Sequence, residues 1–296
     1  MKVRANGLDI EVEDEGPRDG PVVLLIMGLS MQLTAWPPEL VADLVGRGFR
    51  VIRPDNRDIG LSTHLHHLGL PNVGLAVLRH MLHLPVRAPY GIGDMAADCA
   101  GVLDALGVSA AHVCGASMGG MVAQHLAARH PQRVRSLTLL MTSSGARRLP
   151  QPALRIRRAL VARPSGTAFD DWVAHGIRLF SLIGSPAYPP DPQRLRERVA
   201  ASMRRSVNPA GSARQLVAIA ADGDRSAMLS QIQAPTLVIH GKADPLIPLA
   251  AGEDLMRLMK GARADFIDGM GHDLPLELLP RFAAGIADNA ARSTAA

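Results

Sequence analysis

The chain has 296 residues, of which 47% are hydrophobic and 20% are charged. This balance excludes an intrinsically disordered chain, and the length is enough for one large core with an inserted subdomain. The net charge of +5 raises the question of a nucleic-acid partner, but aromatic residues, which stack on unpaired bases, make up only 3% of the chain. We therefore expect no nucleic acid. We interpret the arginine clusters between residues 147 and 205 as solvated helix surfaces, with a preference for anionic substrates left open.

The two cysteines and the N-terminal residues predict where the protein is found. Cys99 and Cys114 are typical of small core residues in a reducing compartment. The first residues lack an apolar signal region, and the run Val22–Met27 is far too short to span a membrane. We expect a cytoplasmic protein without a membrane span, and a homodimer is among the states that the sequence allows.

The first residues predict a β-hairpin. Asn6 and Gly7, which tolerate the positive φ angles of a tight turn, lie between Lys2–Ala5 and Leu8–Glu13. The second of these segments alternates apolar and acidic residues, so one face of the strand should be buried and the other exposed.

After the hairpin, expected strands alternate with expected helices. Val22–Met27 is a continuous apolar run, which is typical of a strand covered on both faces. The further expected strands are residues 50–55, 111–114, 134–141, 236–240 and 264–267, and the expected helices are 40–45, 94–106 and 120–129. Short loops join them, so the pattern predicts a mostly parallel sheet with helices on both faces.

Two stretches interrupt this alternation. Residues 64–89 are apolar and rich in leucine and histidine, and we expect them to wall part of a pocket. Residues 145–225 are helical in composition and contain many prolines. We predict that residues 145–225 form a helical lid inserted after the sixth strand, and that residues 1–144 and 226–296 form the core.

A candidate nucleophile lies between an expected strand and an expected helix. Gly115-Ala116-Ser117-Met118-Gly119 has the pattern G-x-S-x-G in the strand–turn–helix context that gives it meaning. Such a turn exposes the Ser117 hydroxyl at the carboxyl edge of a sheet, beside helix amides that favour negative charge.

A serine hydroxyl needs a base, and the base needs a carboxylate to orient it. His272 ends a glycine-rich loop after the last expected strand, and Asp244 follows the strand that ends at His240. The loop after the preceding strand, Thr142-Ser143-Ser144, offers no carboxylate. We therefore predict Ser117 as nucleophile, His272 as general base and Asp244 as the acid.

An oxyanion hole requires two N–H donors directed at the developing negative charge. One should be the amide of Met118, the residue after the nucleophile. The other should come from the loop after Val22–Met27, and we expect it to be the amide of Leu29.

The three loops, in the order Ser, Asp, His, resemble the α/β-hydrolase superfamily over nearly the whole chain. Four stretches look like the aclacinomycin methylesterase group and related carboxylesterases: Val23–Gly28, Asp55–Thr63, Gly115–Gly120 and Gly269–His272. The resemblance implies the α/β-hydrolase fold and assigns the triad to Ser117, Asp244 and His272. Most of the superfamily has His-Gly where this chain has Met27-Gly28, and segment 64–89 is longer than in the methylesterase, which leaves the substrate open.

The expected reaction is hydrolysis of a small-molecule carboxylic ester through an acyl-enzyme on Ser117. An apolar substrate group is expected from the lid residues Leu179, Phe180, Leu182 and Met203. Cleavage of a carbon–carbon bond or a lactone, perhydrolysis, and a ligand receptor with slow turnover are alternatives that use the same triad.

Two further groups of polar residues, one between positions 55 and 62 and one between positions 64 and 67, are not expected to take part in catalysis. Asp55, Arg57, Gly60 and Ser62 predict a buried ion-pair and turn network that supports the nucleophile's surroundings. The histidines at positions 64, 66 and 67 have no carboxylate or cysteine at ligand spacing, so we expect no metal, and the reaction requires no organic cofactor.

Overall fold

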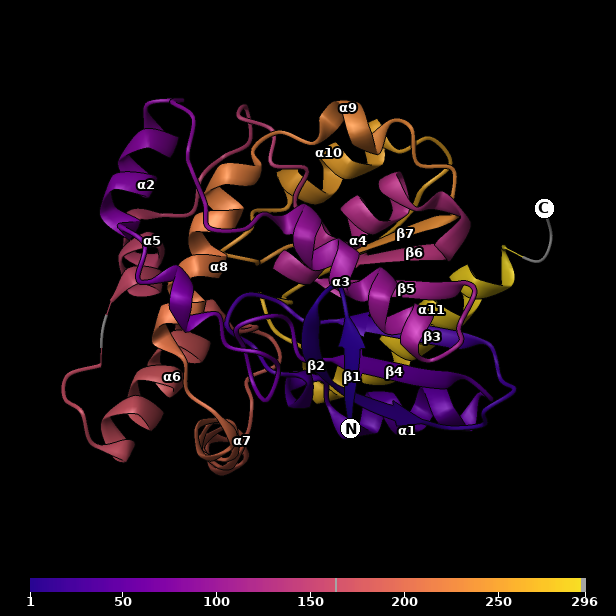
Figure 1. Cartoon of the computed structure of the whole chain (residues 1–296), viewed down its shortest axis with the longest axis horizontal. Helices are drawn as coiled ribbons and strands as arrows, with labels where there is room; N and C mark the ends of the chain where they lie inside the picture. The colour runs from indigo at the N-terminus through magenta and orange to yellow at the C-terminus, as the bar shows by residue number, and fades with distance from the viewer. Residues whose placement is uncertain (163, 294–296) are drawn as a thin grey trace.

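Eight strands form one sheet in the order β1-β2-β4-β3-β5-β6-β7-β8 (Figure 1). The computed structural model describes residues 1–162 and 164–293. The strands are β1 (Lys2–Ala5), β2 (Leu8–Glu15), β3 (Val22–Ile26), β4 (Arg50–Pro54), β5 (Ala111–Ala116), β6 (Val134–Leu140), β7 (Thr236–Gly241) and β8 (Arg263–Ile267). Strands β1, β2 and β4 pair antiparallel, whereas β4, β3, β5, β6, β7 and β8 pair parallel. The predicted hairpin and mostly parallel sheet are confirmed.

Helices cover both faces of the sheet, and the sheet divides the core into two halves. One half packs beneath α3 (Ile92–Ala105), α4 (Met118–Arg129) and α10 (Ala250–Leu258), with the short α9 (Ser226–Leu229) beside α4. The other half packs beneath α1 (Pro38–Gly46) and α11 (Leu279–Ala291). Strands β3 to β7 contribute side chains to both halves, which explains why Val22–Met27 is continuously apolar rather than alternating. The short 3-10 helices are Leu33–Ala35, His66–Leu68, Pro131–Arg133 and Leu276–Leu278.

In the described part of the chain, α9 and four longer helices lie between β6 and β7, and the four longer helices lie beside the sheet in space (Figure 1). They are α5 (Leu154–Val161), α6 (Phe169–Ile183), α7 (Pro192–Arg205) and α8 (Pro209–Asp222). Their position in the chain is the one predicted for the lid, while their role as a lid and the domain boundaries stay predictions. Residue 163 of the predicted lid and residues 294–296 of the predicted core lie outside the described residues.

A buried ion pair fixes these helices to the core. Arg214 of α8 donates from Nε and Nη2 to the Asp58 carboxylate at 2.8 and 2.6 Å, and neither side chain is exposed. Asn208 donates to the Asp58 carbonyl at 2.9 Å. Arg57 makes a second buried pair with Asp98 at 2.6 Å. The network that the sequence predicted around residues 55–62 is therefore present, and it also anchors the inserted helices.

Segment 64–89, for which the sequence pattern predicts no helix or strand, contains α2 (Val73–Met81). The helix begins at Asn72, whose side chain accepts a hydrogen bond from the Leu75 amide at 2.9 Å. It packs against α8, and His80 contacts the Ala220 carbonyl at 3.1 Å. Its role as a pocket wall stays a prediction. Within residues 1–162 and 164–293, no helix combines the length and apolarity that a membrane crossing requires.

Candidate active site

Ser117 occupies the tight turn between β5 and α4. Its backbone has φ 55° and ψ −119°, a strained conformation for a residue with a side chain. The Ser117 amide donates to the Leu140 carbonyl at 2.9 Å, which ties the turn to β6. Gly119 must lack a side chain, because a Cβ there would stand 2.1 Å from the Ile26 carbonyl oxygen. The G-x-S-x-G pattern therefore reflects crowding of the turn against β3.

The His272 ring lies between Ser117 and Asp244. Its Nε2 is 3.0 Å from Ser117 Oγ, and its Nδ1 is 2.7 Å from Asp244 Oδ2. His272 is 8% exposed and Asp244 5%, so water competes little for these hydrogen bonds. The three side chains that the sequence selected from separate loops thus meet at the carboxyl edge of the sheet, in the order that proton transfer requires.

The Asp244 carboxylate is oriented by its own loop. Its Oδ1 accepts the amides of Leu246 and Ile247, each at 2.8 Å, which leaves Oδ2 directed at His272. His240, at the end of β7, holds the same loop through Nε2, 2.8 Å from the Ile247 carbonyl. Burial lowers the pKa of His240, so this ring is neutral at pH 7 and brings no second positive charge beside Asp244.

The end of α6 and the residues that follow it hold the loop that carries His272. The His272 amide donates to the Ile183 carbonyl at 2.7 Å, and the Gly271 amide donates to Ser185 Oγ at 2.8 Å. Ser185 in turn donates to the Asp273 carboxylate. Burial raises the pKa of Asp273, an effect that the Ser185 hydrogen bond partly offsets. Sequence reasoning missed Ser185, because no local pattern connects it with a loop 86 residues away.

The loop after β3 approaches the nucleophile closely. A Cβ built on Gly28 would lie 3.1 Å from Ser117 Cβ, so the backbone of this loop borders the reacting hydroxyl. Among the described residues, the Leu29 amide donates no backbone hydrogen bond. Met118 is the first residue of α4, where the amide has no partner inside the helix. The role of these two amides as oxyanion donors stays a prediction.

Side chains from three parts of the chain fix that loop in place. Asn56 donates to the Met27 carbonyl at 2.8 Å, and Gln215 of α8 accepts the Ser30 amide at 2.9 Å. Asp55 accepts the Leu33 amide at 2.7 Å through Oδ1. No local pattern in the sequence indicates the contact of Gln215, because its partner Ser30 is 185 residues away in the chain.

Asp55 also connects the loop to α7. Its Oδ2 accepts from Arg205 Nη1 at 2.7 Å, and the same nitrogen donates to Gln32 Oε1 at 2.6 Å. Gln32 donates in addition to the Ser202 carbonyl at 2.8 Å. The inserted helices thus contact the loops of Leu29 and His272 directly.

In the part of the chain that the structure describes, no group of three or more His, Cys, Asp or Glu side chains is placed to hold a metal ion.

Comparison with known proteins extends these observations. The model of the α/β-hydrolase fold family matches residues 21–277. The chain is similar to the rhodomycin D methylesterase DnrP of Streptomyces peucetius, with 31% identity over 91% of this chain and 90% of the relative. It is also similar to the 2-hydroxymuconate semialdehyde hydrolase of Pseudomonas sp. CF600, with 28% identity over 100% of this chain and 95% of the relative.

Solved structures show the same architecture. The enol-lactonase from Burkholderia xenovorans LB400 superposes with a TM-score of 0.75 at 25% identity, covering 98% of this chain and 99% of that one. The sheet order, the turn at Ser117, the family match and these relatives agree with one another. The chain belongs to the α/β-hydrolase fold family.

Proposed function

We propose that this enzyme, a carboxylic ester hydrolase, cleaves its substrates through a covalent acyl-enzyme on Ser117. One observation carries the proposal: the His272 imidazole lies within hydrogen-bond distance of both Ser117 Oγ and Asp244 Oδ2. Similarity to methylesterases over nine-tenths of the chain supports an ester as the bond that is cleaved.

Acylation follows from this geometry. Ser117 Oγ attacks the ester carbonyl while His272 Nε2 accepts its proton, and the Asp244 carboxylate stabilises the imidazolium that forms. The negative charge on the carbonyl oxygen is held by the amides of Leu29 and Met118, and the dipole of α4 adds to this stabilisation. His272 then donates its proton to the leaving alcohol, which leaves an acyl group on Ser117.

Deacylation repeats these steps with water. His272 Nε2 takes a proton from a water molecule, which attacks the acyl carbonyl, and the same two amides hold the second oxyanion. Collapse of this intermediate releases the carboxylic acid and returns the proton to Ser117. Asp244 stays ionised throughout, so the triad is regenerated without a cofactor.

The substrate is proposed to carry an apolar group beside the ester. Leu179 and Leu182 of α6 are half-buried and lie within four residues of Ile183, which accepts the His272 amide, and this supports the proposal. Phe180 and Met203 support it less, because they pack in the cluster that joins α6 to α7. A cytoplasmic location is part of the same proposal, supported by the unpaired, buried Cys99 and Cys114.

The test is substrate turnover and trapping of the intermediate. Wild-type enzyme is assayed with methyl, aryl and p-nitrophenyl esters of graded chain length, and mass spectrometry after incubation with a slowly deacylating ester identifies the acylated residue. Ser117→Ala should fold normally and lose at least about 10³ in turnover. Ser109→Ala, an exposed serine on the loop before β5, is the matched control and should retain full activity. Near-normal activity of Ser117→Ala would refute the assignment.

A second candidate is cleavage of a lactone or a carbon–carbon bond by the same triad. It is supported by the likeness to the enol-lactonase and to the 2-hydroxymuconate semialdehyde hydrolase. The same substrate panel, extended with lactones, peracid formation and vinylogous diketones, ranks these reactions by kcat/KM. A single turnover followed by a halt on every substrate would favour a ligand receptor with slow turnover instead.

A further inference from the structure

One side of the molecule exposes many large hydrophobic side chains. Among the described residues, nine of the fourteen exposed large hydrophobics belong to residues 64–93 and 145–162, with exposures between 36% and 69%. We call the surface that they form with neighbouring arginines the apolar–basic face. Its hydrophobic members are Leu68, Leu70, Leu75, Leu78, Met81, Leu82, Leu84, Leu154 and Val161, and its arginines are Arg79, Arg87, Arg155, Arg157 and Arg158.

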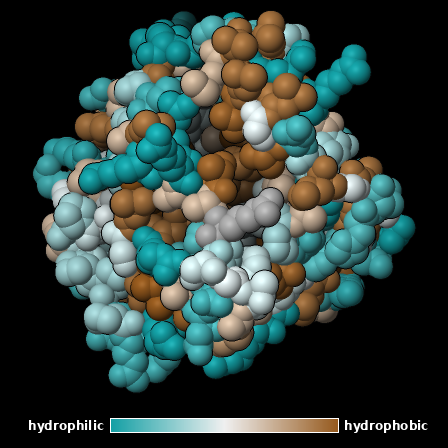
Figure 2. Space-filling view, turned by 90° about the vertical axis from the view of Figure 1, so that its left-hand side faces the viewer, coloured by the Kyte–Doolittle hydropathy of each residue, from teal (hydrophilic) through white to brown (hydrophobic). Residues whose placement is uncertain are grey.

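The two segments lie side by side although about 80 residues separate them. Arg157 Nη2 of α5 is 3.2 Å from Met81 Sδ of α2, across 76 residues of sequence. In Figure 1, α2 and α5 are neighbours at the outer edge of the molecule, with α8 between them and the sheet. Figure 2 shows this side directly: brown hydrophobic side chains gather in its upper half and centre, with teal side chains among them. The face is therefore one continuous surface rather than two separate ones.

The charge of this face is of one sign. Residues 64–93 and 145–162 contain no Asp or Glu. Within the described part of the chain, Arg87, Arg155 and Arg158 have no carboxylate at ion-pair distance, whereas nearby Arg148 is paired with Asp254. Exposed leucine side chains are costly to leave in water, whereas the exposed arginines beside them are well hydrated. A partner that is both apolar and negatively charged would bury the leucines and pair with the arginines.

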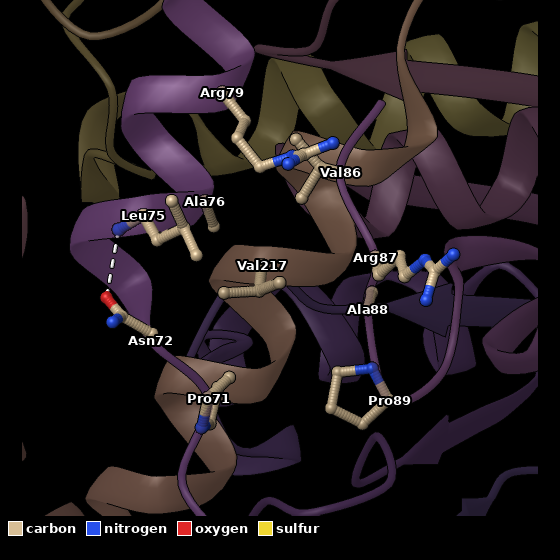
Figure 3. Close-up of a pocket in the computed structure, with 10 residues that line it drawn as sticks. All are labelled: Pro71, Asn72, Leu75, Ala76, Arg79, Val86, Arg87, Ala88, Pro89 and Val217. Carbon is tan, nitrogen blue, oxygen red and sulfur yellow. Dashed lines mark hydrogen bonds between the residues drawn. The ribbon is translucent and has the colours of Figure 1, made fainter. Parts of the chain in front are cut away.

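A hollow opens within the same face (Figure 3). Its volume is about 600 Å³, and it lies between α2, residues 86–89 and Val217 of α8. Apolar side chains such as Leu75 and Val86 line it, together with Arg79 and Arg87. None of the residues of the Ser117 cluster borders it, so this hollow is separate from the candidate active site. Its lining therefore combines apolar surface with positive charge.

We propose that the apolar–basic face binds the surface of anionic phospholipid membranes without crossing them. Acyl chains and glycerol backbones match the exposed leucines, and anionic headgroups match the arginines. A second copy of this chain fits less well, because two such faces would bring unpaired arginines together. The proposal does not depend on ester hydrolysis. When docked, the helices inserted between β6 and β7 would face the lipid, and these helices also contact the loops that carry Ser30 and His272.

The experiment is vesicle co-sedimentation of the full-length protein. Vesicles of phosphatidylcholine alone are compared with vesicles that contain about one third phosphatidylglycerol, at about 0.1 M and about 0.5 M salt. We expect binding to the anionic vesicles only, with weakening at high salt. Each cation near an anionic surface contributes about fivefold to partitioning, so Arg155→Gln/Arg158→Gln should weaken binding at least about tenfold. Leu78→Ser/Leu82→Ser should weaken it at both salt concentrations.

A charge-matched control separates this face from net charge. Lys260→Gln/Arg263→Gln removes two exposed cations at the amino end of β8 and should bind vesicles as the wild type does. Circular dichroism and turnover of a soluble short-chain ester should be unchanged in all three variants. Absence of binding to anionic vesicles at low salt, or equal loss in the control variant, would overturn the proposal. A second outcome would also overturn it: the wild type does not bind vesicles but forms a dimer in sedimentation velocity, and Leu78→Ser/Leu82→Ser dissociates that dimer.

Discussion

The backbone amide of His272 donates a 2.7 Å hydrogen bond to the carbonyl of Ile183, the last residue of α6. The ring proposed as general base is therefore held in part by the inserted helices, which the sequence predicts to form a lid. The Ser185 hydroxyl strengthens this link, since it accepts from Gly271 and donates to Asp273. In physical terms, the inserted helices are a structural part of the candidate active site.

Ser185→Ala should lower kcat more than it raises KM. The substitution removes one hydrogen bond to each side of His272, so the imidazole loses restraint while the surface that contacts substrate is unchanged. We expect a fall in kcat of about tenfold. Steady-state kinetics with a p-nitrophenyl ester measures the change, with the exposed Ser181→Ala on α6 as matched control. An unaltered kcat would mean that the Ile183 bond alone suffices.

Asp244→Asn should fold and lose about 10⁴ in kcat. The asparagine carbonyl can still accept the amides of Leu246 and Ile247, so the loop stays in place. Its NH₂ group then faces His272 Nδ1 and selects the tautomer with the proton on Nε2, which cannot accept the proton of Ser117. Activity and urea unfolding are measured on the same preparation. A large loss of stability beside the loss of activity would contradict this account.

Gln215→Ala should reduce kcat about tenfold by freeing the loop that carries Leu29. The Gln215 side chain accepts the Ser30 amide at 2.9 Å and donates to the Arg57 carbonyl at 3.0 Å. Without it, the donor at Leu29 is less well aligned with the developing oxyanion. Gln193→Ala, an exposed glutamine on α7, is the control. Equal kinetics in the two variants would show that the loop needs no support from α8.

Arg214→Met should destabilise the protein by about 3–5 kcal/mol, because it leaves the buried Asp58 carboxylate without its partner. Adding Asp58→Asn should restore part of that free energy of unfolding by removing the uncompensated charge. Arg4→Met, which breaks an exposed pair with Asp9, should cost less than about 1 kcal/mol. Urea denaturation measures all three. A double variant less stable than Arg214→Met would count against the charge argument.

Stability should fall as the pH is lowered from about 6.5 to about 4, in part through His112. Burial, with a smaller contribution from the Arg135 cation, lowers the pKa of His112 from 6.5 to about 4. Between these values the unfolded chain binds a proton at this site and the folded protein does not, so acid favours unfolding. Allowing for solvent screening, the loss is about 2 kcal/mol.

The His112 contribution is isolated by substitution. His112→Gln removes the titrating ring but keeps a polar group near Ser136 Oγ, which lies 2.9 Å from His112 Nδ1. Unfolding free energies are measured in urea at several pH values between 4 and 7. The slope of stability against pH should be shallower in His112→Gln than in the wild type, and parallel curves would exclude His112 as a source.

Much of the fold was predictable because hydrophobic periodicity is local. The continuous apolar sequence of Val22–Met27 predicts a buried strand. The turn at Ser117 is indicated by its glycines, which the crowded backbone requires. The approximate positions of all eight strands follow from such signals. The two helices after β7, α10 and α11, were not assigned, although the Pro at the start of α11 is a usable sign.

The supports of the site were not predictable, because they depend on distant pairs. No sequence pattern indicates the hydrogen bonds between Gln215 and Ser30 or between Ser185 and Gly271. Each of these contacts depends on how the inserted helices pack against the core. A polar residue on a helix is usually solvated, so a single sequence favours that interpretation for Gln215 and Arg205. The sequence identified the groups proposed to react, whereas their restraint became visible only in three dimensions.

Ser117, the proposed nucleophile, and His272, its proposed base, are 155 positions apart in the chain, and this separation has a consequence for protein synthesis. A ribosome adds about 5–20 residues per second, so on the order of ten seconds or more pass between the appearance of the hydroxyl and that of its base. Throughout that interval the nascent polypeptide bears a serine without a proton acceptor. Hydrolytic competence should therefore arise abruptly near the end of translation, and premature termination upstream of the histidine should yield inert product.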